Sequence, residues 1–103
     1  MTAVSNANTW SPNAGKLDVF VGQIATAKGI HERLGADVAV LQTQTGGIPM
    51  TVVYVTSFES GAAYGAFIDA LGEDDEWQQF WATATADPSA ELVQSAVYSV
   101  IDM

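Results

Sequence analysis

The fold of this chain is decided by residues 36–60, ADVAVLQTQTGGIPMTVVYVTSFES. This stretch predicts two β-strands, about 36–45 and 49–58, joined by a Gly-Gly-Ile-Pro turn. The second strand is apolar on both faces, with Val52, Tyr54 and Phe58 on one side and Val53 and Val55 on the other. Such a strand lies in the middle of a sheet that is covered on both sides.

The segments around this hairpin predict a strand–helix–strand–strand–helix–strand order. Residues 15–34 repeat apolar side chains every three or four positions, as a helix does. Residues 60–86 predict a second helix in two pieces, with a break near 72–74. Residues 2–10 and 91–101 alternate as the first and last strands. The order predicts an α+β, ferredoxin-like βαββαβ sandwich, in which a four-stranded antiparallel sheet carries its helices on one face.

Composition limits the classes of partner. The chain has 103 residues, which predicts one domain over 1–103. Twelve acidic against three basic residues give a net charge of -9, which disfavours nucleic acid and anionic membranes as partners. Without cysteine there is neither a disulfide framework nor a thiolate metal site. No secretory signal or membrane span is evident in the sequence, so we expect a soluble, cytoplasmic protein.

The second apolar face of the hairpin needs a cover that a short chain does not supply. Helices on one side leave the other side of the sheet open. Charged residues make up only 15% of the chain, which suggests that part of its surface is covered by another chain. We therefore expect a homodimer through the sheet face.

Three stretches resemble the dimeric α/β-barrel superfamily, and NIPSNAP-like members of it most of all. They are WSPNAGKLDVFV, GGIPMTVVYVTSFES and EWQQFWATA, and the resemblance covers nearly the whole chain. It implies that two sheets pack face to face in a dimer and that any ligand lies between sheet and helices. The superfamily includes cofactor-free monooxygenases, haem-degrading enzymes, isomerases and ligand-binding domains, so the resemblance leaves the function open.

Three functions fit this pattern. The first is a dimeric α/β-barrel domain that binds a small, largely apolar ligand between sheet and helices. The second is a cofactor-independent monooxygenase or isomerase that acts on an aromatic or polyketide-like substrate. The third is a structural dimer module whose helix–sheet core is filled. Polar groups that converge on a cavity would distinguish these alternatives.

His31, the only histidine, is the candidate catalytic base of the second function. It lies on the apolar stripe of the first helix, near Tyr64 in the expected sandwich. The alternative is a structural histidine at a helix C-terminus. Haem-degrading relatives carry their axial histidine on the second helix, so that role does not transfer to His31. If it is buried, we expect its pKa to be lowered.

The candidate ligand-binding residues are aromatic or amide side chains. We expect the tryptophans to gather at the end of the sandwich away from His31, where they form either an aromatic pocket or a packed core. Trp81 is expected to be buried. Asn8 alternates with Trp10 on the first strand and faces the same side. The full set is Asn8, Trp10, Tyr54, Tyr64, Trp77 and Trp81.

No cofactor or metal site is predicted. The acidic run at residues 73–76 suits the first turn of a helix better than a calcium loop, because it lacks the spacing of such loops. Gly46-Gly47 is a turn and not a phosphate loop, since no helix follows it. The sequence also lacks nucleotide-binding and nucleophile-elbow motifs.

Overall fold

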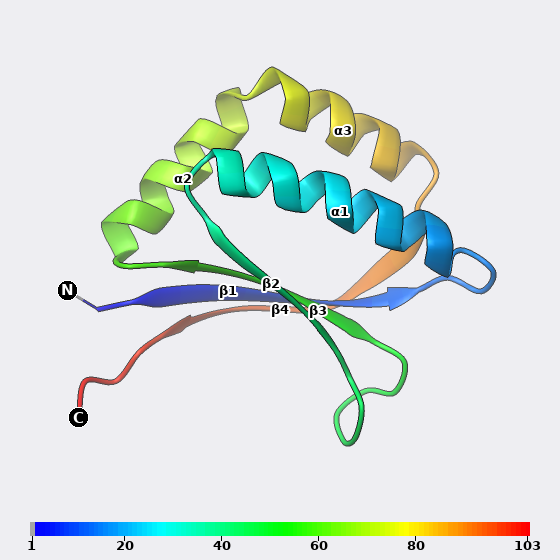
Figure 1. Cartoon of the computed structure of the whole chain (residues 1–103), viewed down its shortest axis with the longest axis horizontal. Coiled ribbons are helices and arrows are strands. Elements are labelled where there is room, and N and C mark those ends of the chain that lie inside the picture. The colour runs from blue at the N-terminus through cyan, green and yellow to red at the C-terminus, as the bar shows by residue number, and fades with distance from the viewer. Residues whose placement is uncertain (1) are drawn as a thin grey trace.

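The computed structural model describes residues 2–103 and has the predicted order of elements (Figure 1). The second helical region is divided in two, as expected. The elements are β1 (Val4–Pro12), α1 (Leu17–Arg33), β2 (Asp37–Gln42), β3 (Val52–Phe58), α2 (Gly61–Glu73), α3 (Asp75–Ala86) and β4 (Ala90–Ser99).

The four strands form one antiparallel sheet in the order β2-β3-β1-β4. All helices lie on one side of this sheet, and its other side is open (Figure 1). This arrangement confirms the ferredoxin-like α+β fold. The strands β1 and β3 occupy the centre, which is where the two-faced apolar pattern placed β3.

The β2–β3 connection is longer than the predicted turn. β2 ends at Gln42 and β3 begins at Val52. Between them, Gly46 and Gly47 take positive φ angles, which are not compatible with a strand. Thr51 closes the base of this loop. Its Oγ1 lies 2.8 Å from Thr43 Oγ1 and donates to the carbonyl of Ile48 over 2.7 Å.

Asp74 is the residue at which α2 ends and α3 begins. Its carboxylate accepts a hydrogen bond from Trp77 N–H over 2.9 Å, which caps α3. Asp75 and Glu76 follow in the first turn, where the helix dipole favours acidic side chains. The acidic run is therefore a helix start, as the sequence indicated.

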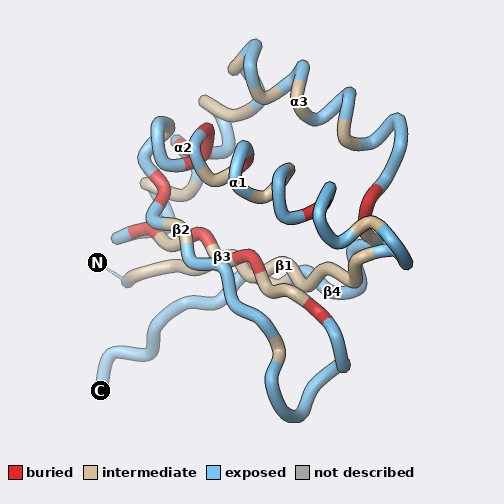
Figure 2. Tube along the Cα trace, turned by 45° about the vertical axis from the view of Figure 1, so that its right-hand side comes forward, coloured by how far each residue is buried: buried red, intermediate tan, exposed pale blue. Residues whose placement is uncertain are grey.

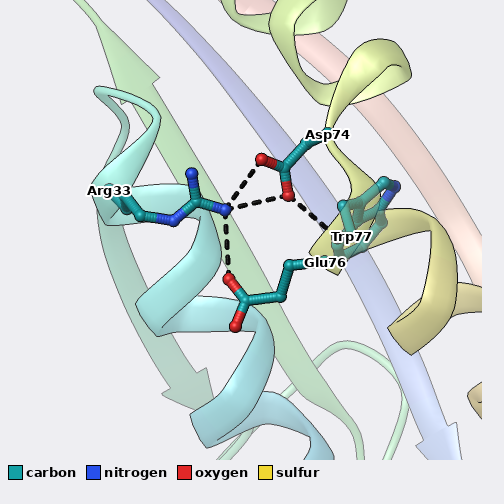
Figure 3. Close-up of polar contacts among 4 residues, drawn as sticks. All are labelled: Arg33, Asp74, Glu76 and Trp77. Atoms are coloured by element: carbon teal, nitrogen blue, oxygen red, sulfur yellow. Dashed lines mark hydrogen bonds and ion pairs between the residues drawn. The ribbon is translucent and has the colours of Figure 1, made fainter.

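Ion pairs hold α3 alongside α1 at both ends. Arg33 at the end of α1 binds Asp74 and Glu76 at distances of 2.8 and 3.0 Å (Figure 3). Lys16 at the start of α1 binds Asp87, just beyond α3, at 2.9 Å. The two helices therefore run antiparallel, and the first turn of α3 lies beside the last turn of α1.

Most of the buried residues lie on α1 and β3 (Figure 2). Ala36, Phe58 and Phe67 form a small apolar cluster near the start of α2. No residue of α3 is buried, so this helix covers the sheet without packing tightly against it. Within residues 2–103, no helix is long and apolar enough to cross a membrane.

Candidate functional site

A cavity of about 580 Å³ lies between the sheet and the helices. Ligand pockets in proteins commonly measure about 300–1,000 Å³. The floor of the cavity is formed by β1, β3 and β4, and its roof by α1, α2 and α3. The cavity occupies the space that a filled core would take in a purely structural module.

The floor and the roof differ in chemistry. The floor carries amide and hydroxyl groups that alternate along the strands and face the helices, among them Asn6, Asn8, Thr56 and Ser95. The roof is mainly apolar and includes Phe20, Ile24, Ala27, Phe67, Leu71, Trp77, Phe80 and Trp81. The site therefore offers a flat apolar molecule contact on one side and hydrogen bonds on the other.

His31 and Tyr54 form a buried pair at one end of the cavity. His31 Nδ1 lies 2.7 Å from the Tyr54 hydroxyl oxygen, and both side chains line the cavity. The exposed fractions of the two residues are only 7% and 6%. His31 comes from the last turn of α1 and Tyr54 from the centre of β3, so the pair joins the roof to the floor.

Burial sets the protonation of this pair. It lowers the pKa of His31 from 6.5 to about 4, because a charged imidazole loses its hydration there. Burial, and to a lesser extent the charge of Glu32, raises the pKa of Tyr54 well above its ordinary value. Both groups are therefore neutral at pH 7. The lowered pKa of His31 agrees with the direction expected for a buried histidine.

Aromatic rings surround the imidazole. The ring centroid of His31 lies 4.6 Å from that of Trp77 and 5.5 Å from that of Phe67. The expectation that the tryptophans lie away from His31 is therefore wrong for Trp77. The reason is the Arg33–Asp74 ion pair, which brings the first turn of α3 to the end of α1 (Figure 3).

Tyr64 was predicted to bind a ligand, but it does not line the cavity. Among the residues that the structure describes, it is absent from the lining, and its hydroxyl instead accepts a hydrogen bond from Asn6 Nδ2 over 3.1 Å. Its ring packs on Phe58 at a centroid distance of 5.3 Å. Tyr64 therefore positions Asn6, which does line the cavity.

The expected burial of Trp81 is also wrong. We expected a buried side chain, but 45% of Trp81 is exposed. Its ring stacks on Trp77 with centroids 5.5 Å apart, and it lines the cavity. The stripe on α3 thus faces the cavity and its rim instead of a filled core.

The far end of the cavity lies near the start of α1. Trp10 packs there on Phe20 with ring centroids 6.1 Å apart. Ser89 Oγ donates to Gln23 Oε1, which ties the segment after α3 to α1. The cavity therefore runs along the sheet, from Trp10 at one end to His31 at the other.

The structure brings five of the six candidate ligand residues, and His31, to one cavity. These five are Asn8, Trp10, Tyr54, Trp77 and Trp81. The predicted set does not include Asn6 and Thr56, whose side chains face the helices from β1 and β3. Alternation along β1 places Asn6 on the side of Asn8, and alternation along β3 places Thr56 on the side of Tyr54 and Phe58, so both had a local signal. Ser95 depends on the register of β4, which is irregular opposite Thr9 and Trp10.

Two residues that line the cavity each have one buried side-chain polar atom without a hydrogen-bond partner within residues 2–103. These atoms are His31 Nε2 and Asn6 Oδ1, and we call them the two unpaired atoms. Asn8 is partly satisfied, because its Oδ1 accepts from Ser95 Oγ over 2.6 Å. A search for clusters of three or more potential metal ligands over the described residues finds none.

Comparison with known proteins agrees with this architecture. The sequence matches no family model and no curated protein. Among solved structures, a NIPSNAP-domain protein from Burkholderia xenovorans is similar at 19% identity and a TM-score of 0.73, over 97% of this chain and 94% of that one. The chain has the fold of NIPSNAP-domain proteins.

Two further structures are similar over most of their length. A NIPSNAP-family protein from Agrobacterium tumefaciens has a TM-score of 0.74 at 16% identity, over 98% of this chain and 86% of that one. A protein of unknown function from Bacteroides thetaiotaomicron, described as a possible oxidoreductase, has a TM-score of 0.69 at 7% identity, over 96% and 98%. The resemblance to NIPSNAP-like α/β-barrel proteins is thus confirmed for the fold.

Proposed function

We propose that this protein binds a small, largely apolar molecule in the cavity between its sheet and its helices. The observation that carries the proposal is the cavity itself, which combines an aromatic roof with a polar floor. Folded interiors are normally close-packed, so a space of about 580 Å³ at this position calls for an occupant. Trp77, Trp81 and Phe80 would contact the flat faces of such a molecule.

Filling the cavity tests the proposal. Ala84 lines the cavity from α3, whereas Ala82 on the same helix is exposed and lies outside the lining. Ala84→Leu should abolish binding of naphthalene, followed by amide chemical shifts in NMR, and Ala82→Leu should leave it unchanged. Equal binding by both variants, or no binding by the unmodified protein, would contradict a ligand site at this place.

The proposal includes a homodimer in which the open face of one sheet packs against that of a second copy. Support comes from the apolar character of this face. Leu41 and Tyr98 are about half exposed there, and Val53 and Val55 are partly exposed. A stable pair should bury at least about 1,200 Å² in total. Sedimentation as a monomer at micromolar concentration would contradict this part of the proposal.

A second candidate is a cofactor-independent monooxygenase or isomerase that acts on an aromatic substrate. It is favoured by the buried His31–Tyr54 pair and by the description of the Bacteroides thetaiotaomicron structure as a possible oxidoreductase. A histidine with a pKa of about 4 is a weak base, which makes binding the better supported function. Oxygen uptake or isomerisation of a bound aromatic substrate, lost in His31→Phe, would establish the enzyme instead.

A further inference from the structure

The cavity wall is uncharged. None of its lining side chains, as far as residues 2–103 are concerned, is an aspartate, glutamate, lysine or arginine. An ionised ligand would lose its hydration inside the cavity without gaining an opposite charge, which is costly. An anion would also meet the field of a chain with a net charge of -9. The wall therefore selects an uncharged molecule.

The two unpaired atoms give this uncharged site its directional groups. His31 Nε2 and Asn6 Oδ1 are both buried, and both residues line the cavity. A buried polar atom without a hydrogen bond costs about 1–3 kcal/mol. A ligand atom that reaches such a group recovers this energy, so these atoms favour a ligand that carries oxygen over a pure hydrocarbon.

The Tyr54 hydroxyl determines which hydrogen-bond role His31 Nε2 plays. If Nδ1–H donated to the hydroxyl oxygen, the buried hydroxyl hydrogen would have no acceptor among the described residues. If the hydroxyl donates to Nδ1, the hydroxyl hydrogen and Nδ1 are both paired. A neutral imidazole then carries its hydrogen on Nε2. His31 therefore faces a ligand as a neutral N–H donor.

The amide of Asn6 supplies a second group. Its Nδ2 donates to the Tyr64 hydroxyl oxygen, which leaves Oδ1 as an acceptor. If the amide is turned by 180°, Tyr64 donates to Oδ1 and Nδ2 is left over instead. In either orientation one polar atom of Asn6 remains for a ligand.

We infer that the ligand is an uncharged aromatic molecule with a hydroxyl or carbonyl oxygen that accepts a hydrogen bond from His31 Nε2–H. This inference rests on the proposed binding function and specifies its ligand class. The aromatic part of the molecule packs against the rings of Trp77 and Trp81, which are stacked 5.5 Å apart. His31 acts as a donor to the ligand and not as the catalytic base that the sequence suggested.

Three probes of one ring size test this inference: naphthalene, 2-naphthol and 2-naphthoate. A net hydrogen bond contributes about 1 kcal/mol, so 2-naphthol should bind roughly fivefold more tightly than naphthalene. The anion 2-naphthoate should bind at least about tenfold more weakly than 2-naphthol. Dissociation constants from NMR titration of the unmodified protein give both ratios.

Each outcome of the probe series is decisive. If 2-naphthol and naphthalene bind equally, the inference fails while the proposed binding function stands. If 2-naphthoate binds most tightly, the inference of an uncharged ligand fails. If none of the three binds, the proposed function and the inference fail together.

Two variants test whether His31 is the group that donates a hydrogen bond to the ligand. His31→Phe keeps an aromatic ring between Trp77 and Phe67 but removes the N–H, so it should abolish the preference for 2-naphthol and retain naphthalene binding. Thr83→Val removes a hydroxyl from an exposed position of α3 outside the cavity lining and should change neither affinity. A preference for 2-naphthol that survives in His31→Phe would overturn the assignment. The probe series on unmodified protein still decides the ligand class if His31→Phe does not fold.

The nitrogen-15 signals of the His31 imidazole give a direct test. A histidine with a purely structural role would show no shift of its Nε2 signal when a ligand binds. Nitrogen-15 spectra should show hydrogen on Nε2 and none on Nδ1, and the Nε2 signal should shift when 2-naphthol is added. Hydrogen on Nδ1 in the free protein, or an Nε2 signal that ignores 2-naphthol, would contradict the proposal.

Discussion

The face of the sheet beneath the helices carries Asn6, Asn8, Thr56 and Ser95, whereas the face turned away from them carries Ala7, Ala39, Leu41, Val53, Val55 and Ala96. The inner face also carries Trp10, Tyr54 and Phe58, so its polar groups stand among aromatic rings. A sheet face that packs under helices is usually apolar throughout. Amides and hydroxyls under the helices suit a molecule that needs hydrogen bonds. Small apolar residues on the outer face suit a flat protein surface.

The largest effect is expected on the outer face. Val55 lies at its centre, between Ala7 and Ala39, so Val55→Lys would bury an unpaired charge in the proposed dimer. We expect the dimer to weaken about 1,000-fold, or about 4 kcal/mol. Val21→Lys introduces the same charge on an exposed position of α1 and serves as control. Sedimentation equilibrium of both variants measures the difference, and an unchanged Val55→Lys dimer would show that the outer face is free.

The second effect concerns the inner face, where the protonation of His31 should make the stability of the protein depend on pH. The pKa of this histidine is lower in the folded than in the unfolded protein, so its contribution to stability is complete above pH 6.5 and is lost as the pH falls toward 4. The free energy of unfolding should decrease by roughly 3 kcal/mol over this range. The Arg33 hydrogen bonds lower the pKa of Asp74, so that carboxylate titrates below this window.

The histidine contribution is isolated by comparing unmodified protein with His31→Phe. Urea unfolding at several pH values should show the slope between pH 6.5 and 4 only in the protein that retains His31. Parallel pH profiles for the two proteins would mean that the imidazole is as easily protonated in the folded state as in the unfolded state.

The two stacked indoles of the roof should differ in importance for stability. Trp77 packs on His31, Phe80 and Trp81, so Trp77→Ala should cost roughly 3 kcal/mol. Trp81 is 45% exposed, so Trp81→Ala should cost only about 1 kcal/mol while it weakens binding of 2-naphthol. Urea midpoints and NMR titrations measure the two effects. Equal losses of stability would show that Trp81 is packed as a core residue.

The smallest effect concerns how the roof is held in place. Asp74→Asn keeps a side chain that can cap α3 but removes the charge that pairs with Arg33, and Asp74→Ala removes both. Thermal unfolding should place Asp74→Asn between the unmodified protein and Asp74→Ala. The His31–Trp77 contact should loosen in both variants, visible as a changed shift of the His31 ring protons. Identical melting of the two variants would assign the whole effect to the ion pair with Arg33.

The strands and helices were predictable because their patterns are local. The alternation in residues 52–58 and the helical spacing in residues 17–33 depend on neighbours in the chain. The start of α3 was also predictable, since Asp74 and the acidic residues after it act within one turn. These features fixed the βαββαβ order and the helix break.

The arrangement of the roof was not predictable in the same way. The position of Trp77 over His31 depends on ion pairs between Arg33 and Asp74 and between Lys16 and Asp87, which join residues far apart in sequence. The exposure of Trp81 was missed for a different reason. A helical stripe shows which side of α3 faces the sheet, and the stripe is the same whether the space beneath is filled or empty.

The ion pairs also determine what a protease can report about this protein. The three basic residues of the chain, Lys16, Lys28 and Arg33, all lie on α1 or at its first boundary, and each is engaged by an acidic side chain. Trypsin cleaves only after lysine and arginine, so every cut must fall on this one helix. The rate of tryptic digestion therefore reports how often α1 or its first boundary opens, locally or in global unfolding, and residues 34–103 remain a single uncut fragment.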